Sequence, residues 1–260
     1  MVHIAPNHQQ AYNQGMLLIT IVEGDMRQVM GQLTRQQIEA MLTGQDGSLN
    51  LAGADLSNLD LSHLDLSGAN LSEATLVGVN LQDAQLRNTS LDQANLRQAN
   101  LGQANLSHAN LAGANLGEAN LSEVYLLRAN LTEANLAGAN LAKAKLDEAN
   151  LTRANLERVN LDRAYLVRTH LNQANLTQAN LNGANLKNAI LDGANLTAAS
   201  LNEAFMEGAS LAGTDLRRVN LIGATLTKAT YNSQTQWASD FDPVVAGAVT
   251  KKKKWLGLFG

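Results

Sequence analysis

The sequence predicts an all-β solenoid, a fold in which one short chain segment is repeated and stacked many times. Three observations predict it. From Leu51 to Leu226 every fifth residue is leucine except Met206, so 35 of 36 positions are Leu without an insertion. The residue two before each Leu is usually Ala, and the residue directly before it is usually Asn. A period of five fits neither an α-helix, on which these Leu would form no stripe, nor a continuous strand, on which an odd period alternates faces.

A bend in every five-residue unit reconciles this repeat with a buried interior. Ala and Leu lie two residues apart, so a short extended piece directs both inward and directs the intervening Asn outward. The two remaining residues of each Ala-Asn-Leu-X-X unit are mostly small, polar or charged, without an evident order. We therefore expect them at solvated corners around a core of Ala and Leu.

The composition argues against several classes of function. The chain has 260 residues, no cysteine and a net charge of -4, which indicates neither a thiolate metal site, nor a cysteine nucleophile, nor nucleic-acid binding by bulk charge. His63, His108 and His170 fall on different sides of the expected solenoid, whose convex surface offers no cleft for acid–base chemistry. We expect no enzyme activity, no cofactor and no metal.

The repeated units resemble the pentapeptide-repeat family, whose consensus is A(D/N)LXX, over residues 49 to about 230. The resemblance implies a right-handed, four-sided (quadrilateral) β-helix with four units per coil, and hence about nine coils of 20 residues, roughly 43 Å long at ~4.8 Å per coil. A 20-residue coil also fits the residues that replace Asn at Tyr125, Lys145, Tyr165 and Phe205, because their numbers differ by 20, 20 and 40. The domain prediction is a β-helix over 49–230.

The preceding residues, 1–48, are predicted to form an N-terminal cap that is partly helical. Thr34 and Gln37 form a capping box before Ile38, and Gly44 supplies a stop, which predicts a short helix over about 35–43. Apolar residues from Val22 to Leu33 suggest a second helix, and 16–22 a strand or buried helix. Residues 1 to about 12 are expected to be mobile.

Residues 231–250 are predicted to close the other end, with three aromatic capping residues, Tyr231, Trp237 and Phe241. This segment resembles the one that follows the repeats in many cyanobacterial family members, although Ala238 stands where Pro often follows the aromatic residue. Residues 251–260 are expected to be a disordered tail. Its run Lys251–Lys254, followed by Trp255, leaves weak membrane contact open as an alternative to a solubilising tail.

No segment approaches the roughly 18 apolar residues that a membrane span needs. The apolar run 16–22 is short and no Lys or Arg precedes it, so we expect no signal peptide and a cytoplasmic protein. The chain is expected to be monomeric.

The candidate partner surface comprises residues that depart from the consensus on one side of the solenoid: Tyr125, Leu127, Arg128, Lys145, Tyr165, Val167, Arg168 and Phe205. One interpretation is an aromatic–cation–aromatic ladder that needs no partner. The other is an amphipathic patch of the kind that protein interfaces favour.

A second basic feature is a belt with one arginine per side of a single coil, at Arg153, Arg158, Arg163 and Arg168. One interpretation is that the belt binds an acidic partner. The other is that it forms exposed ion pairs with Glu133 and Glu148, which leaves Lys143 and Arg163 unpaired.

The functional prediction is a non-enzymatic rod that acts as a protein-interaction scaffold for an unknown protein partner. Family members that imitate DNA imply a second possibility, a binder of a DNA topoisomerase. The repeats hold 13 Lys and Arg against 17 Asp and Glu, and the arginine belt interrupts any acidic run, which disfavours that possibility. Nucleic acid itself is not expected as a partner, and membrane association through the tail is a third possibility.

Overall fold

The computed structural model describes residues 33–43 and 49–250, which belong to the second of two units, Gly31–Gly260. The helix predicted over 22–33 lies outside the described residues except for Leu33. The segment 16–22 and the tail 251–260, with its membrane alternative, also lie outside them.

Helix α2 spans Arg35–Thr43, the range that the capping box predicts. The backbone N–H of Thr34 donates to Gln37 Oε1 at 2.8 Å, and the N–H of Gln37 donates to Thr34 Oγ1 at 3.3 Å, so both halves of the box are formed. Ile38 is fully buried.

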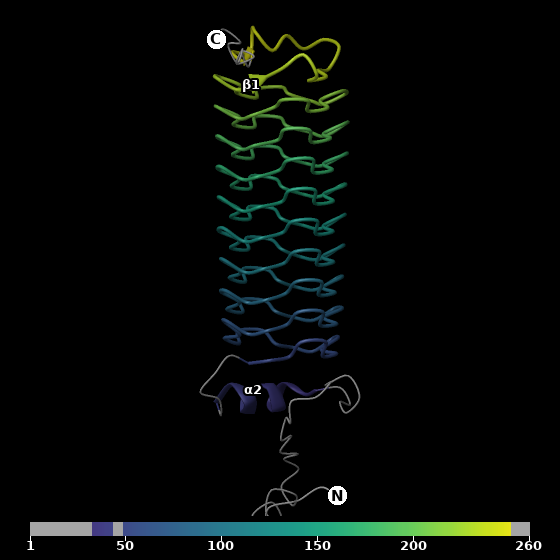
Figure 1. Cartoon of the computed structure of the whole chain (residues 1–260), viewed down its shortest axis with the longest axis vertical. Coiled ribbons are helices and arrows are strands. Elements are labelled where there is room, and N and C mark those ends of the chain that lie inside the picture. Colours follow the sequence, from purple (N-terminus) through teal and green to yellow (C-terminus); the bar gives the residue numbers. More distant parts are fainter. Residues whose placement is uncertain (1–32, 44–48, 251–260) are drawn as a thin grey trace, which may run out of the picture. The chain divides into compact units, whose positions relative to one another are not determined.

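The repeats form coils of 20 residues. Parallel bridges join each outward residue to the one 20 positions later, from Asn50↔Asn70 to Ser210↔Thr230, and this confirms the expected coil length. Four bridges occur per coil, so the stack has four sides. Figure 1 shows the coils stacked one above another. We number the sides by the first outward residue of each: side one begins at Asn50, side two at Asp55, side three at Asp60 and side four at Asp65.

Ala and Leu fill the interior and Asn faces outward, as predicted. Leu101 and Ala104 are fully buried, and Met206 is buried in the Leu register. Thr replaces Ala at three fully buried positions, where each hydroxyl donates to the carbonyl of the Leu 23 residues earlier: Thr89 to Leu66, Thr169 to Leu146 and Thr214 to Leu191. The interior therefore holds no unpaired hydroxyl at these positions.

A unit uses all five of its backbone N–H groups, as residues 99–103 show. Three donate to neighbouring coils: Asn100 to Val79 O, Leu101 to Asn120 O and Gln103 to Ser122 O. Ala99 N–H closes the preceding turn on Leu96 O, and Gly102 N–H donates to the side-chain Oδ1 of Asn100. The outward Asn is thus part of the backbone hydrogen-bonding scheme.

The two corner residues are not equivalent, which corrects the expectation of unordered solvated corners. The second corner residue has a positive φ in every unit, in 26 non-glycine residues and in ten glycines between residues 53 and 228. A positive φ at the third position of a four-residue turn, without one at the second, indicates a type II turn. Gly is accordingly frequent there, whereas only Gly102 and Gly117 occupy the first corner position.

The chain beyond the repeats continues two sides of the stack. Gln236 bridges to Asp215, and β1, Thr230–Tyr231, pairs in parallel with β2, Val249–Thr250. The Tyr231 and Trp237 rings meet edge to face at 5.5 Å between centroids, and Trp237 stacks on Phe241 at 5.3 Å. All three predicted aromatic residues are half-buried and in contact.

Candidate protein-interaction face

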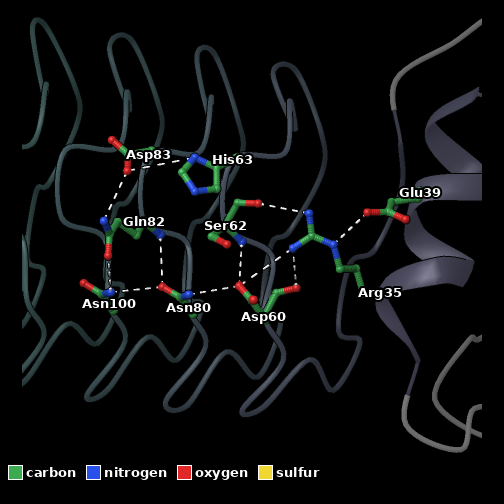
Figure 2. Close-up of polar contacts among 9 residues, drawn as sticks. All are labelled: Arg35, Glu39, Asp60, Ser62, His63, Asn80, Gln82, Asp83 and Asn100. Carbon is green, nitrogen blue, oxygen red and sulfur yellow. Dashed lines mark hydrogen bonds and ion pairs between the residues drawn. The ribbon is translucent and has the colours of Figure 1, made fainter.

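Side three shows what an undisturbed side looks like. From Asn180 back to Asp60, each Asn Nδ2 donates to the Oδ1 of the residue 20 positions earlier, at 2.8 to 3.4 Å. Figure 2 shows the first part of this ladder, through Asn100, Asn80 and Asp60. The amides satisfy one another, so from Asp60 to Asn180 the outward column of this side offers no apolar group to a partner.

Side four breaks this pattern at Tyr125. Bridges join Tyr125 to Lys145 and Lys145 to Tyr165, and the same column continues through Asn185 to Phe205. The structure therefore places the four predicted residues in one column, with Asn185 between Tyr165 and Phe205. We call the following set the aromatic face: Tyr125, Leu127, Arg128, Lys145, Tyr165, Val167, Arg168 and Phe205.

The apolar side chains of the aromatic face are open to solvent. Tyr125, Leu127, Tyr165 and Phe205 are 41%, 39%, 48% and 53% exposed, whereas the Leu beneath them are fully buried or nearly so. Val167 is half-buried. These outward residues therefore contribute little to the core.

Lys145 contacts one of its two tyrosine neighbours. Its Nζ lies 3.9 Å from the centroid of the Tyr125 ring, in cation–π geometry. Within the described part of the chain, Lys145 has no such contact with Tyr165 and no carboxylate within 4.0 Å. An aromatic–cation ladder that needs no partner explains Tyr125 and Lys145. It gives no structural role to Tyr165, Leu127 and Phe205.

A charged ladder borders the aromatic face along one corner. Arg128 Nε lies 2.7 Å from Glu148 Oε2, and Arg168 Nη1 lies 3.3 Å from Glu148 Oε1. The hydrogen bond from Arg128, and then its charge, lower the pKa of Glu148 below its ordinary value. Two guanidinium groups share one carboxylate, so the border keeps a positive charge beside the apolar side chains.

Asp147 is a residue of this region that sequence reasoning missed. Tyr165 lacks the side-chain acceptor that Asn offers to the first corner N–H, and Asp147 Oδ1 from the preceding coil accepts the Val167 N–H instead, at 2.9 Å. The same substitution recurs where Ser210 replaces Asn, because Asp192 Oδ1 accepts the Ala212 N–H at 3.0 Å. The signal in the sequence is an Asp that lies 20 residues before the first corner residue of a unit whose outward residue is not Asn.

The arginine belt is mostly paired. Arg153 lies 2.8 Å from Glu133, and Arg158 donates to Gln178. Lys143, expected to be unpaired, lies 3.6 Å from Glu123, so that expectation is wrong: a Glu 20 residues earlier supplies its partner. Arg163 has no carboxylate within 4.0 Å among the residues described. The belt is chiefly a set of exposed pairs.

Residues 33–43 and 49–250 contain neither a metal-ligand cluster nor a membrane-spanning helix. No three His, Asp or Glu side chains in these ranges lie together as a metal ion requires. His63 Nδ1 lies 3.9 Å from Asp83 Oδ2, which also accepts a hydrogen bond from Gln82 Nε2 (Figure 2). None of the helices described there is long and apolar enough to cross a bilayer.

Comparisons with known proteins agree with the repeat pattern. A family model described as pentapeptide repeats matches in eight copies, with matched segments from 50–88 to 189–227. No curated protein matches the chain.

Among solved structures, HetL, a pentapeptide repeat protein involved in heterocyst differentiation regulation from the cyanobacterium Nostoc sp. strain PCC 7120, is 31% identical. That match covers 79% of this chain and 95% of HetL, with a TM-score of 0.46. The Nostoc protein alr5209 is 37% identical over 41% of this chain and 84% of its own, with a TM-score of 0.34. QnrB1, a plasmid-mediated fluoroquinolone resistance protein, is 16% identical over 72% of this chain and 90% of its own, with a TM-score of 0.43.

Proposed function

We propose that this chain, which belongs to the pentapeptide-repeat family, is a non-enzymatic scaffold whose aromatic face binds a protein partner. Members of the family fold as right-handed quadrilateral β-helices and serve structural or interaction roles. The proposal takes this chain as about nine such coils, capped by residues 1–48 and 231–250, monomeric and cytoplasmic.

The observation that carries the proposal is the exposure of Tyr125, Leu127, Tyr165 and Phe205 on one side of a stack whose side three is a polar ladder from residue 60 to residue 180. Tyrosines and arginines are enriched at protein interfaces, and scattered single apolar residues would need no such explanation. Here the apolar residues share one column and one corner. This arrangement favours a protein partner that presents apolar side chains.

Lys145 and the Arg128–Glu148–Arg168 ladder add a charge preference. The three cations stand beside two carboxylates, and one of these, Asp147, is already occupied by the Val167 N–H. A partner with acidic residues around an apolar centre would complement this surface.

The test restores the consensus on this side with Tyr125→Asn, Leu127→Thr, Tyr165→Asn and Val167→Thr in one variant. Asn at 125 and 165 would supply the side-chain acceptor for the first corner N–H, as Asn does in other units, so folding should be preserved. The matched control carries Ala137→Thr and Glu157→Thr, at the equivalent corner position on the opposite side of the stack.

Both variants are used to capture proteins from extracts of the source cells, and the captured partner is then purified and its affinity measured directly. We expect the consensus variant to bind it at least about tenfold more weakly and the control to bind it as the parent does. A consensus variant that loses several kcal/mol of stability while its binding is unchanged would contradict the proposal. That result would favour the aromatic–cation ladder that needs no partner.

No described feature favours a topoisomerase-binding DNA mimic. The charges along the stack alternate in sign, as in Arg128, Glu148 and Arg168, whereas duplex DNA presents continuous negative charge. Peripheral membrane contact would depend on residues 251–260, which the structure does not describe.

A further inference from the structure

Arg35 of α2 reaches from the helix to the edge of the first coil. Its Nη1 donates to the backbone carbonyl of Asp60 at 3.0 Å, and its Nη2 donates to the carbonyl of Ser62 at 3.2 Å (Figure 2). One guanidinium group thus donates hydrogen bonds to two main-chain carbonyls on side three.

The corresponding carbonyls of the next coil show what these acceptors normally bind. Asn80 O accepts the N–H of Leu61 at 2.7 Å, and Gln82 O accepts the N–H of His63 at 3.0 Å, both from the coil before. No described coil precedes Asp60 and Ser62. The two N–H groups of Arg35 therefore take the place of the two backbone donors that a preceding coil would supply.

The helix fixes the guanidinium in this orientation. Arg35 Nε lies 2.7 Å from Glu39 Oε1, one helical turn later, which leaves both terminal nitrogens directed at the edge. Arg35 Nη1 also lies 3.7 Å from Asp60 Oδ1. A planar fork with several fixed donors suits two adjacent acceptors, whereas a lysine ammonium is a single point charge.

The C-terminal edge of side three carries the complementary groups. Leu221 and Gly223 hold the positions whose N–H groups donate to the following coil throughout the stack, and for neither is there an acceptor among the described residues. Ile222, between them, is 74% exposed. The same side thus has two acceptors at one end and two donors with the same spacing at the other.

We propose that the N-terminal edge of side three is a pairing surface for the C-terminal edge of a second copy of this chain, and that Arg35 keeps it closed. An open strand edge is a template for further pairing, and proteins commonly cover such edges with charged groups or helices. Pairing between unlike ends is heterologous and does not close, so an uncovered edge would build linear chains of molecules. The proposal is independent of the aromatic face.

The test compares Arg35→Ala with the parent by sedimentation velocity over a range of concentrations at neutral pH. We expect the parent to sediment as one species and the variant to reach at least about twice its mass at high concentration, with linear particles in electron micrographs. The matched control is Arg87→Ala, which removes an arginine that lies away from this edge.

A double variant, Arg35→Ala with Ile222→Glu, identifies the contact. The new carboxylate would face Asp60 of the neighbouring molecule, so we expect the size of the parent to return. Oligomers that persist in the double variant would overturn pairing through the C-terminal edge. A folded Arg35→Ala protein that stays at the size of the parent would show that Arg35 only anchors α2.

Arg35→Lys is a second variant that tests the proposal if Arg35→Ala fails to fold. It keeps the positive charge and most of the aliphatic stem but cannot span both carbonyls. We expect it to associate at higher concentrations than Arg35→Ala does, and a Lys variant identical in size to the parent at all concentrations would contradict the proposal.

Discussion

An outward Asn within the ladder performs two tasks at once. Asn120 Oδ1 accepts the backbone N–H of Ser122 at 3.2 Å, and its Nδ2 donates to Asn100 Oδ1 at 2.8 Å. The ladder has a direction, because every amide donates toward the N-terminal end. A residue of the first coil has no described residue to donate to, so an acceptor alone is sufficient there. This explains why three of the four outward positions of the first coil are Asp.

The direction of the ladder predicts that Asp is tolerated in the first coil and not in the middle of the stack. Asn120→Asp removes the donor to Asn100 and sets a carboxylate against the Asn100 oxygen, so we expect a loss of about 1–3 kcal/mol in the free energy of unfolding. Asn50→Asp, the matched control, keeps the acceptor for the Ala52 N–H, and its effect should be small. Denaturant titration measures both variants. Equal losses would show that the ladder carries no direction.

The carboxyls of the first coil also predict the pH dependence of stability. Hydrogen bonds from the hydroxyl and backbone N–H of the serine two residues later hold the pKa of each below its ordinary value: Asp55 from Ser57, Asp60 from Ser62 and Asp65 from Ser67. A lowered pKa in the folded state stabilises the protein above the unfolded pKa of about 3.9, and this contribution is lost as the pH falls through the folded value.

We therefore expect the free energy of unfolding to change little between about pH 7 and 5.5 and to fall below about pH 4. A variant with Asn at positions 55, 60 and 65 should show a smaller decrease over the acid range. Urea titrations at a series of pH values compare the two proteins. An identical acid decrease in both would mean that other carboxyls, such as Glu118 or Asp215, control it.

At the scale of the element, each corner is a type II turn. The second corner residue adopts a φ of 53° to 73°, a region in which an L side chain costs roughly 1–2 kcal/mol and glycine costs far less. Non-glycine residues nonetheless hold most of these positions. The stack compensates for the strain because the N–H of the same residue is bonded to the next coil, as Gln103 N–H is to Ser122 O.

The turn predicts the sign of two substitutions. Ala198 has a φ of 58°, so Ala198→Gly should relieve backbone strain. Glycine also has more entropy in the unfolded chain, which opposes this gain, so we expect the free energy of unfolding to rise by roughly 0.5–1 kcal/mol. Gly138→Ala should lower it by about 1 kcal/mol, because a Cβ there meets only Glu118 Cγ at 3.9 Å and the cost is one of backbone conformation. Thermal unfolding measures both. A higher free energy of unfolding for Gly138→Ala would show that the positive φ at this position does not strain an alanine.

Residues that repeat at a fixed period could be predicted, and residues whose role depends on one particular neighbour could not. The Leu register and the column of Tyr125, Lys145 and Tyr165 follow from counting, and α2 follows from Thr34 and Gln37. The positive φ of the second corner residue has a signal in the sequence, because ten of its positions are Gly and only two of the first corner positions are.

Asp147 and Arg35 show why the remaining roles were not predicted. Asp147 acts on Val167 from 20 residues away, and Arg35 acts on Asp60 from 25 residues away. The partners of Arg35 cannot be chosen until the position of the helix is known. Asp147 cannot be assigned to Val167 until it is known that the first corner N–H needs a side-chain acceptor. The Lys143–Glu123 pair is different: its members lie one 20-residue coil apart, so the predicted coil length already contained the signal for it.

At the scale of the whole molecule, every backbone contact in the repeats is with the same coil or an adjacent one. Bridges between outward residues span 20 positions up to Ser210↔Thr230, and the last one, Asp215↔Gln236, spans 21. Stability in such a stack is approximately a sum over neighbouring coils, so a local defect opens the nearest coils first and leaves distant ones closed.

The closing segment tests this behaviour. Trp237 contacts both Tyr231 and Phe241, and its Nε1 is buried without a hydrogen-bond partner, so packing alone holds the ring in place. Since the ring is half-buried, Trp237→Ala should cost about 2–3 kcal/mol, less than the 3–5 kcal/mol of a fully buried aromatic residue.

Hydrogen exchange followed by mass spectrometry locates the effect of Trp237→Ala. We expect faster exchange across 211–250 and unchanged exchange across 91–150, because the coils between them do not depend on the end. Phe205→Ala is the control: that ring is 53% exposed, and its loss should change exchange in neither region. If Trp237→Ala accelerated exchange equally along the whole stack, the coils would unfold as a single cooperative unit, and the aromatic cluster would govern the stability of the entire solenoid.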